Sequence, residues 1–233
     1  MNETIQNIIT RRSVKKYTSQ PVPRELIEEI CKAGTYAPTG MNSQSPLIIA
    51  VTNRELRDRL SRMNSDIIMG RNLKTSTAPG ADPFYGAPVV LVVLAKKSVG
   101  THVYDGSLVM ENLMLAAHSL GLGSCWIHRA KEEFESEEGK EILRSLGIEG
   151  EYEGIGHCIV GYAAPDALKP QVARKDDYIV WAEEAAEKPS ASRCGENGKD
   201  QHYEHHGGAQ RATIGHKIKN GVGEYHYCSA PSH

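Results

Sequence analysis

The chain has 233 residues, which is enough for one hydrophobic core, and its formal net charge is only -2 because 29 acidic residues offset 27 basic ones. This charge provides no field that would attract nucleic acid or an anionic membrane, so we expect neither as a partner and instead expect a small-molecule substrate. The sequence has no apolar stretch of the ~20 residues that span a bilayer, and no signal peptide at its start, which predicts a cytoplasmic protein. Five irregularly spaced cysteines predict reduced thiols rather than disulfides.

Helical spacing of isoleucines predicts a short helix over residues 3–10, followed by a basic turn. A second helix is expected between Pro23, which suits a first helical turn, and Pro38. Further helices are predicted over 54–69 and 132–146, the latter as a charged surface helix. Residues 105–120 are apolar or small almost all round, which predicts a central helix that a second subunit would also contact.

Continuous β-branched runs predict buried strands over residues 47–51, 88–95 and 156–162. Residues 72–83 lack periodicity and predict a mobile loop that would cover a site. From about Glu187 the chain has few aliphatic residues and six of its ten histidines. We therefore expect an α/β or α+β domain over residues 1–182 and a polar, disordered extension over residues 183–233.

Two basic clusters are candidates for binding a phosphate. Arg11, Arg12 and Ser13 offer guanidinium donors and a hydroxyl at a helix end. Lys169, Arg174 and Lys175 lie about 160 residues later. A solvated basic turn is the alternative for either cluster taken alone.

Two further segments suit a planar heterocycle. Asn42 and Gln44 lie in a polar loop and offer both amide donors and carbonyl acceptors, although an ordinary turn would also use them. Residues 121–127 combine glycines with an aromatic, which would let the backbone approach a flat ligand. Residues 121–126 are not a dinucleotide-binding motif, because they follow a helix and lack the third glycine.

Taken together, these motifs resemble the nitroreductase family in order and spacing over residues 3–181. The matching segments are Arg11-Arg12-Ser13, Ala37-Pro38-Thr39 through Asn42-Ser43-Gln44, Phe84-Tyr85-Gly86-Ala87-Pro88, residues 121–127, residues 156–162 and Arg174-Lys175. The resemblance implies an α+β fold with a mixed central β-sheet flanked by helices, and an intertwined homodimer with FMN at the subunit interface. One departure is Ser45-Pro46-Leu47, where many relatives have Pro-Trp, so the substrate pocket is expected to differ there.

The resemblance also implies the site residues and the reaction. Arg11, Arg12, Ser13 and Arg174 would hold the phosphate with help from Lys175, and Lys15 would lie near the pyrimidine ring of the flavin. Pro38, Thr39, Asn42 and Gln44 would reach the partner's flavin, while Cys125, Trp126 and Ile127 would line its other side. The expected reaction is ping-pong hydride transfer through flavin N5 from NADH or NADPH to a nitroaromatic-like or quinone-like electrophile, without a catalytic side chain.

Three other functions are compatible with parts of the sequence. A thiol enzyme would use Cys125 with His128, or Cys158 with His157, but no third group that would orient the base is apparent. A metal site would draw on residues of the extension, whose spacing matches no standard zinc pattern: Cys194, His202, His205, His206 and Cys228. A flavin-binding module without turnover is the third alternative.

Overall fold

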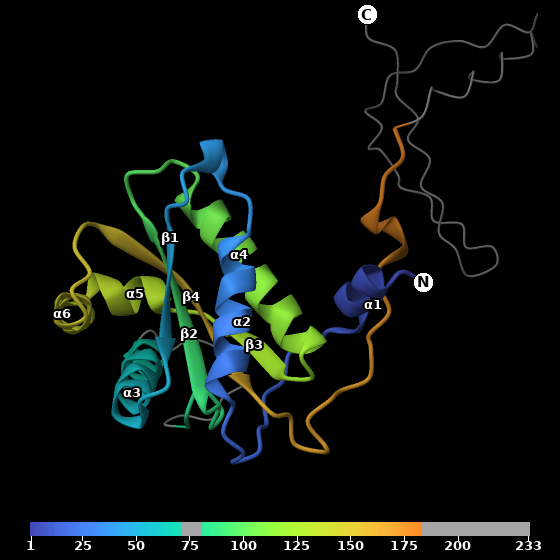
Figure 1. Cartoon of the computed structure of the whole chain (residues 1–233), viewed down its shortest axis with the longest axis horizontal. Helices are drawn as coiled ribbons and strands as arrows, with labels where there is room; N and C mark the ends of the chain where they lie inside the picture. Colours follow the sequence, from blue (N-terminus) through green and yellow to red (C-terminus); the bar gives the residue numbers. More distant parts are fainter. Residues whose placement is uncertain (71–80, 183–233) are drawn as a thin grey trace, which may run out of the picture. The chain divides into compact units, whose positions relative to one another are not determined.

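The computed structural model describes residues 1–70 and 81–182 (Figure 1). Contacts delimit one compact unit over Met1–Tyr178. The domain boundary at residue 182 stays a prediction. The extension with its proposed metal ligands, and most of the expected loop over 72–83, lie outside the described residues. No helix in the described part of the chain is long and apolar enough to cross a membrane.

The centre of the unit is a four-stranded sheet with the order β1-β2-β4-β3, in which all neighbours are antiparallel. The sheet and its flanking helices confirm the expected α+β fold. A mixed sheet was expected; here the parallel pairing is an isolated bridge between Ser13 and Ser124, outside the four strands. Three strands match the predicted apolar runs, whereas β3, which is short and begins with small residues, was not predicted. The strands are β1 Pro46–Val51, β2 Val89–Lys96, β3 Gly123–Ile127 and β4 Tyr152–Gly161.

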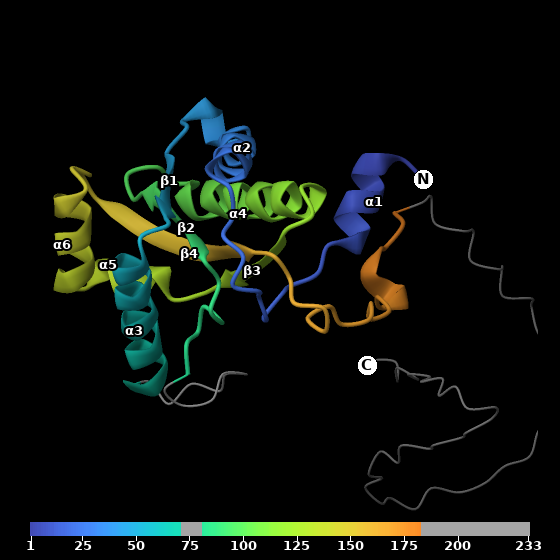
Figure 2. The same cartoon turned by 60° about the horizontal axis from the view of Figure 1, so that its bottom comes forward.

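Helices cover both faces of this sheet (Figures 1 and 2). Helices α2 (Arg24–Thr35) and α4 (His102–Ser119) lie on one face, and α3 (Arg54–Gly70), α5 (Ala130–Glu135) and α6 (Glu137–Ser145) lie on the other. Side chains of β2 alternate between the two resulting cores, which is why the strand is buried on both faces and almost wholly apolar: Leu91 and Val93 join the first core, and Val90 and Val92 the second.

Helix α4 confirms the prediction of a central helix, since its buried residues include Val109, Met110 and Leu113. Its other face leaves Val103, Tyr104 and Leu108 exposed. Helix α1 (Glu3–Thr10) lies beside α4, where the Asn7 side-chain amide donates to the Leu115 carbonyl over 3.0 Å, yet its isoleucines are also exposed. These apolar surfaces are available to a second chain.

The prediction of one charged surface helix over 132–146 is wrong. The chain becomes extended at Ser136, whose Oγ caps α6 by accepting from the Gly139 amide over 3.0 Å. Helix α5 is also largely buried, and its Glu133 is fully enclosed. One oxygen of this carboxylate accepts from Asn64 Nδ2 over 2.5 Å, and the other lies 2.9 Å from His157 Nε2 inside the second core.

Candidate functional site

The segment after α1 runs along the free edge of β3. The Val14 amide donates to the Ser124 carbonyl over 2.9 Å. A Cβ atom on Gly123 would lie 2.8 Å from a Val14 methyl group, so only glycine lets the two segments approach this closely. The space that the sequence suggested for a planar ligand at Gly123 is thus taken by Val14, and the contact fixes Arg11 and Arg12 at the edge of the sheet.

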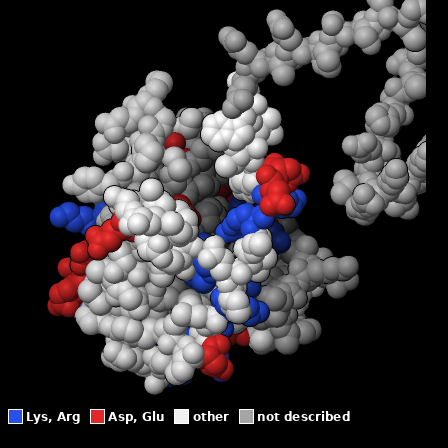
Figure 3. Space-filling model, turned by 90° about the vertical axis from the view of Figure 1, so that its right-hand side faces the viewer, with Lys and Arg blue, Asp and Glu red and all other residues white. Residues whose placement is uncertain are grey.

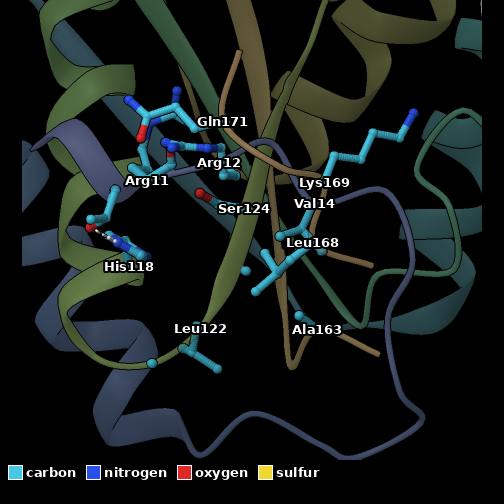
Figure 4. A pocket seen from close by; sticks show the side chains of 13 residues that line it. Arg11, Arg12, Val14, His118, Leu122, Ser124, Ala163, Leu168, Lys169 and Gln171 are labelled. Atoms are coloured by element: carbon cyan, nitrogen blue, oxygen red, sulfur yellow. Dashed lines mark hydrogen bonds between the residues drawn. The ribbon is translucent and has the colours of Figure 1, made fainter. Parts of the chain in front are cut away.

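A cavity of about 430 Å³ opens at this edge (Figure 4). Its lining contains three cationic side chains and no carboxylate, and it combines the N-terminal segment, the end of α4, the start of β3 and the segment after β4. Figure 3 shows Lys and Arg side chains gathered near the middle of one face of the molecule. The lining residues are Thr10, Arg11, Arg12, Val14, His118, Gly121, Leu122, Gly123, Ser124, Ala163, Leu168, Lys169 and Gln171.

The two arginines in this cavity have different hydrogen-bonding states. Arg12 Nη1 donates to the carbonyls of Ile9 and Arg11 over 2.8 and 2.7 Å. Arg11 Nη1 is buried without a hydrogen-bond partner among the described residues, and its Nε lies 3.9 Å from a Glu111 carboxylate oxygen. Ser124 Oγ is likewise buried and unpartnered there. Buried polar atoms are rarely left unpaired, so these donors are suited to an anionic ligand.

Ser13 and Lys15 adjoin the cavity. The Ser13 hydroxyl contacts the Cys125 thiol; burial raises the pKa of that thiol, against the opposing effects of this contact and of the charges on Lys15 and Arg11. Lys15 Nζ lies 5.5 Å from the centre of the Tyr85 ring, which is a cation–π distance. The backbone of Tyr85 is in the left-handed region, with φ of 54°.

The three predicted residues on β3 do not share one face. Cys125 and Ile127 belong to the core under α3 and α5, whereas Trp126 packs against the core under α4. Trp126 lies against Gly156, where a Cβ atom would be 2.4 Å from its Nε1. A ligand beside this strand therefore meets the backbone and alternate side chains rather than a continuous wall of three side chains.

The predicted loop of Pro38, Thr39, Asn42 and Gln44 lies at the other end of α4 (Figure 1), around the short helix η1 (Gly40–Asn42). Met41, Asn42 and Gln44 all have positive φ values of 47–55°, an unfavourable conformation for residues other than glycine.

Asp105 holds this loop in place from the first turn of α4. Its carboxylate is 3% exposed and accepts from the Gly40 amide over 3.0 Å, from Thr101 Oγ1 over 2.9 Å and from Ser43 Oγ over 3.4 Å. A Cβ on Gly40 would collide with Thr101. Asn42 and Gln44 are thus presented to solvent on a loop that is strained but anchored.

Helical rise places Asp105 and His118, in the first and last turns of α4, roughly 20 Å apart. The structure therefore does not bring the loop and the cavity of one chain together. The segment Ser45-Pro46-Leu47, where the sequence departs from many relatives, is partly enclosed by the protein. Ser45 is only 5% exposed, and Leu47 packs against the second core.

Comparison with known proteins identifies the family. The model described as "Nitroreductase family" matches residues 8–162. The chain belongs to the nitroreductase family. A relative from Archaeoglobus fulgidus, a "putative NADH dehydrogenase/NAD(P)H nitroreductase", is 34% identical over 151 residues, which cover 64% of this chain and 78% of the relative. An "FMN reductase [NAD(P)H]" from Bacillus subtilis is 33% identical over 199 residues, covering 75% and 72%.

Coverage differs among these relatives. The match to a protein of Methanothermobacter thermautotrophicus with the same description as the Archaeoglobus relative, 32% identical, spans 60% of that protein and 53% of this chain. Among solved structures, a nitroreductase with bound FMN from Bacteroides fragilis has a TM-score of 0.70 at 28% identity, and the match covers 78% of this chain and all of that one.

The structure places only some of the predicted phosphate ligands in the cavity. Arg11 and Arg12 line it, and Ser13 adjoins it. Arg174 and Lys175 are exposed and are not among the lining residues, although Lys169 of the same basic cluster is. Their role stays a prediction. Sequence reasoning missed Thr10, His118 and Gln171, because no pattern links one residue on each of three distant segments.

The geometry gives no support to a thiol enzyme among the described residues. Cys158 is fully buried, which raises the pKa of its thiol, and the neighbouring His157 points to the opposite face of β4 and contacts Glu133. His128 is exposed beyond the end of β3, whereas Cys125 is 4% exposed. No group of three or more potential metal ligands occurs in the described part of the chain.

Proposed function

We propose that this nitroreductase binds FMN and uses NADH or NADPH to reduce small electrophiles of the nitroaromatic or quinone type. The observation that carries the proposal is the buried Nη1 atom of Arg11, which has no hydrogen-bond partner among the described residues and lies in a cavity with three cationic side chains. Family membership gives this site its ligand, since relatives are described as FMN reductases and solved relatives contain FMN.

The residues of the cavity fit the phosphate end of FMN. Among the described residues, Arg11 Nη1 is an unpaired charged donor, Ser124 supplies an unpaired buried hydroxyl, and the exposed Lys169 supplies an ammonium group. Phosphate oxygens accept several such bonds at once, and each charge-assisted bond is stronger than a neutral one. The absence of a carboxylate from the lining keeps the local charge favourable for an anion.

FMN, when bound, supplies a ring system whose N5 accepts hydride from the nicotinamide and passes it to the second substrate. The chain itself binds and orients this group. Lys15 is the cation that the family resemblance places near the flavin pyrimidine ring, and its positive charge stabilises negative charge there. The Tyr85 ring, 5.5 Å from the Lys15 ammonium, holds it in position. Because both substrates use one flavin face in turn, the kinetics are ping-pong.

The site is completed by a second copy of the chain in a homodimer. The loop that carries Asn42 and Gln44 lies roughly 20 Å from the cavity of its own chain, so it serves the flavin of the partner. The exposed Val103, Tyr104 and Leu108 on α4 and the exposed isoleucines of α1 supply the apolar surface for this association.

Flavin content and turnover test the proposal directly. The full-length protein is expected to be yellow, to release FMN rather than FAD on denaturation, and to consume NADH or NADPH when a quinone or nitroaromatic acceptor is added. Protein that neither contains nor takes up FMN would contradict the proposal. FMN retention with no consumption of either nicotinamide would instead indicate a flavin-binding module.

Mixed dimers test the division of the site between chains. One variant carries Arg11→Ala, and the other carries Asn42→Ala with Gln44→Ala. Each is expected to have little activity alone. After the two are unfolded and refolded together, random pairing restores about a quarter of wild-type activity, since half of the dimers contain one intact site. If each site belonged to one chain, mixing would restore nothing.

A further inference from the structure

His118 is a cavity residue to which the family resemblance gives no role. It occupies the last turn of α4, lines the cavity with Arg11 and Arg12, and also lines a neighbouring cavity formed with α1 (Figure 4). It is half-buried, and it lies 2.8 Å from Thr10 Oγ1 through its Nε2 atom. The charged groups on the elements around it are Arg11, Arg12 and Lys169, together with Glu111 on α4 and Glu3 on α1.

The hydrogen bonds of Thr10 determine which nitrogen of His118 carries a proton. A threonine hydroxyl has a single hydrogen, and Thr10 Oγ1 donates it to the Gln6 carbonyl over 2.7 Å. Towards His118 the hydroxyl must therefore accept, so Nε2 is the protonated nitrogen of the neutral ring. Nδ1 is left as the atom that gains a proton when the ring becomes charged, and this gain leaves the bond to Thr10 intact.

The positive charges that line the cavity oppose that proton. Burial lowers the pKa of His118, and the positive charges of Arg11 and Arg12 lower it further. The ring is thus mainly neutral at pH 7. A phosphate dianion among the same side chains reverses the electrostatic balance and favours the imidazolium, as does the C-terminal end of α4.

We propose that His118 is a proton-coupled ligand of the FMN phosphate, which gains a proton at Nδ1 as the phosphate enters the cavity. This inference rests on the proposed function, and it adds a residue that discriminates FMN from riboflavin. The proton comes from solvent and no covalent bond changes. By linkage, a group whose pKa is higher in the bound state than in the unbound state strengthens binding when it is protonated. Its contribution is complete at pH values below the unbound pKa, and it is lost as the pH rises through the bound pKa.

The test is the pH dependence of FMN dissociation from the full-length protein. Diluted holoprotein is followed by the fluorescence of free flavin from pH 5.5 to 8.5. Because the unbound pKa of His118 lies below its usual value of 6.5, wild-type affinity is expected to fall from below pH 6.5 until the pH passes the bound pKa, by about tenfold in total for each unit by which phosphate raises that pKa. Protonation of the FMN phosphate itself acts in the opposite direction, since it weakens binding at the acid end.

Variants separate His118 from other titrating groups. His118→Gln is expected to abolish the decline with rising pH, and His118→Asn serves if the glutamine variant does not fold. His102→Gln is the matched control, because His102 lies at the opposite end of the same helix, 3.7 Å from a Glu153 oxygen. That variant should keep the wild-type profile. Riboflavin added to the flavin-free chain should show no such decline, because it lacks the phosphate.

The outcomes distinguish this inference from the proposed function. Tight FMN binding with no decline as pH rises from 5.5 to 8.5, or a decline that persists in His118→Gln, would overturn the role of His118 and leave the flavoenzyme intact. An equal decline for riboflavin would also overturn it. Failure of the wild-type chain to bind FMN at any pH would overturn both.

Discussion

The two ends of helix α4 are prepared for a ligand in different ways. At the first turn, Asp105 is enclosed and its oxygens accept from three neutral donors, so the loop of Gly40–Asn42 is fixed before any ligand arrives. At the last turn, the cavity contains Arg11 and Ser124 with buried polar atoms that lack partners among the described residues. One end has a satisfied network that fixes geometry, whereas the other has unpaired donors that an anion would satisfy.

This difference predicts opposite consequences for binding and for turnover. Changes at the cavity should alter FMN affinity and spare riboflavin. Changes beneath the loop should alter turnover and leave phosphate recognition unaffected.

Arg11→Ala is expected to produce the largest effect, a loss of FMN affinity of about ten- to a hundredfold. The reason is the loss of charge-assisted bonds to phosphate worth roughly 1.5–3 kcal/mol each. Equilibrium titration with FMN and with riboflavin measures it, and riboflavin affinity should change little. Arg24→Ala, which removes an exposed arginine paired with Glu28, is the control for general effects of charge. Equal losses for both flavins would mean that Arg11 lies near another part of the flavin.

Asp105→Asn should reduce kcat/KM about tenfold while FMN affinity changes little. An amide has one accepting oxygen where the carboxylate has two, so it cannot accept from all three donors, and each lost hydrogen bond to a charged group is worth roughly 1.5–3 kcal/mol. The strained backbone of Met41–Gln44 would then relax away from the partner's flavin. Steady-state kinetics measure the change in turnover, and thermal unfolding measures the stability lost with the hydrogen bonds. Thr101→Val removes one donor from the same carboxylate and should have a smaller effect in the same direction.

Arg12→Ala should weaken FMN binding only a few-fold, although this arginine is adjacent to Arg11. Its Nη1 atom already donates to the carbonyls of Ile9 and Arg11, so the main loss is about 1 kcal/mol of stability at the end of α1. Denaturant unfolding of the flavin-free chain measures that loss. A fall in FMN affinity as large as that of Arg11→Ala would show that the two guanidinium groups bind phosphate equally.

The sequence predicted those parts of the molecule whose signal is local. Strand β2 and helix α4 have long periodic or apolar runs, and their existence was predicted correctly. Strand β3 was not recognised, because its pairing partner β4 and the contact with Val14 decide that Gly123 and Ser124 are extended. The break at Ser136 was missed although its signal is local, since serine is a preferred N-cap residue and Gly139 lets the second helix lie close to the Glu133 backbone.

The residues of the candidate site also differ in whether a local sequence pattern predicts them. Arg11 and Arg12 follow from a motif next to a helix end, and the structure places both in one cavity. The anchoring of the loop by Asp105 across 65 residues and the contact between Thr10 and His118 across 108 residues depend on tertiary packing, which no local pattern encodes. Alternation along β3 likewise separates Trp126 from its two neighbours once the segment is known to be a strand.

Cys125→Ala is expected to have the smallest effect on turnover, leaving at least about half of the NAD(P)H oxidation rate. Cys125 follows the cavity residue Ser124 on β3, so a thiol reaction would add chemistry to the cavity end of this contrast. Burial raises the pKa of the thiol, so at pH 7 it is protonated, and only the thiolate is a nucleophile. The thiolate population grows as pH rises towards the raised pKa, and a thiol enzyme would accelerate with it. The wild-type pH–rate profile should therefore superimpose on that of Cys125→Ala between pH 6 and 8. A rate that collapses in the variant while FMN remains bound would revive the thiol mechanism.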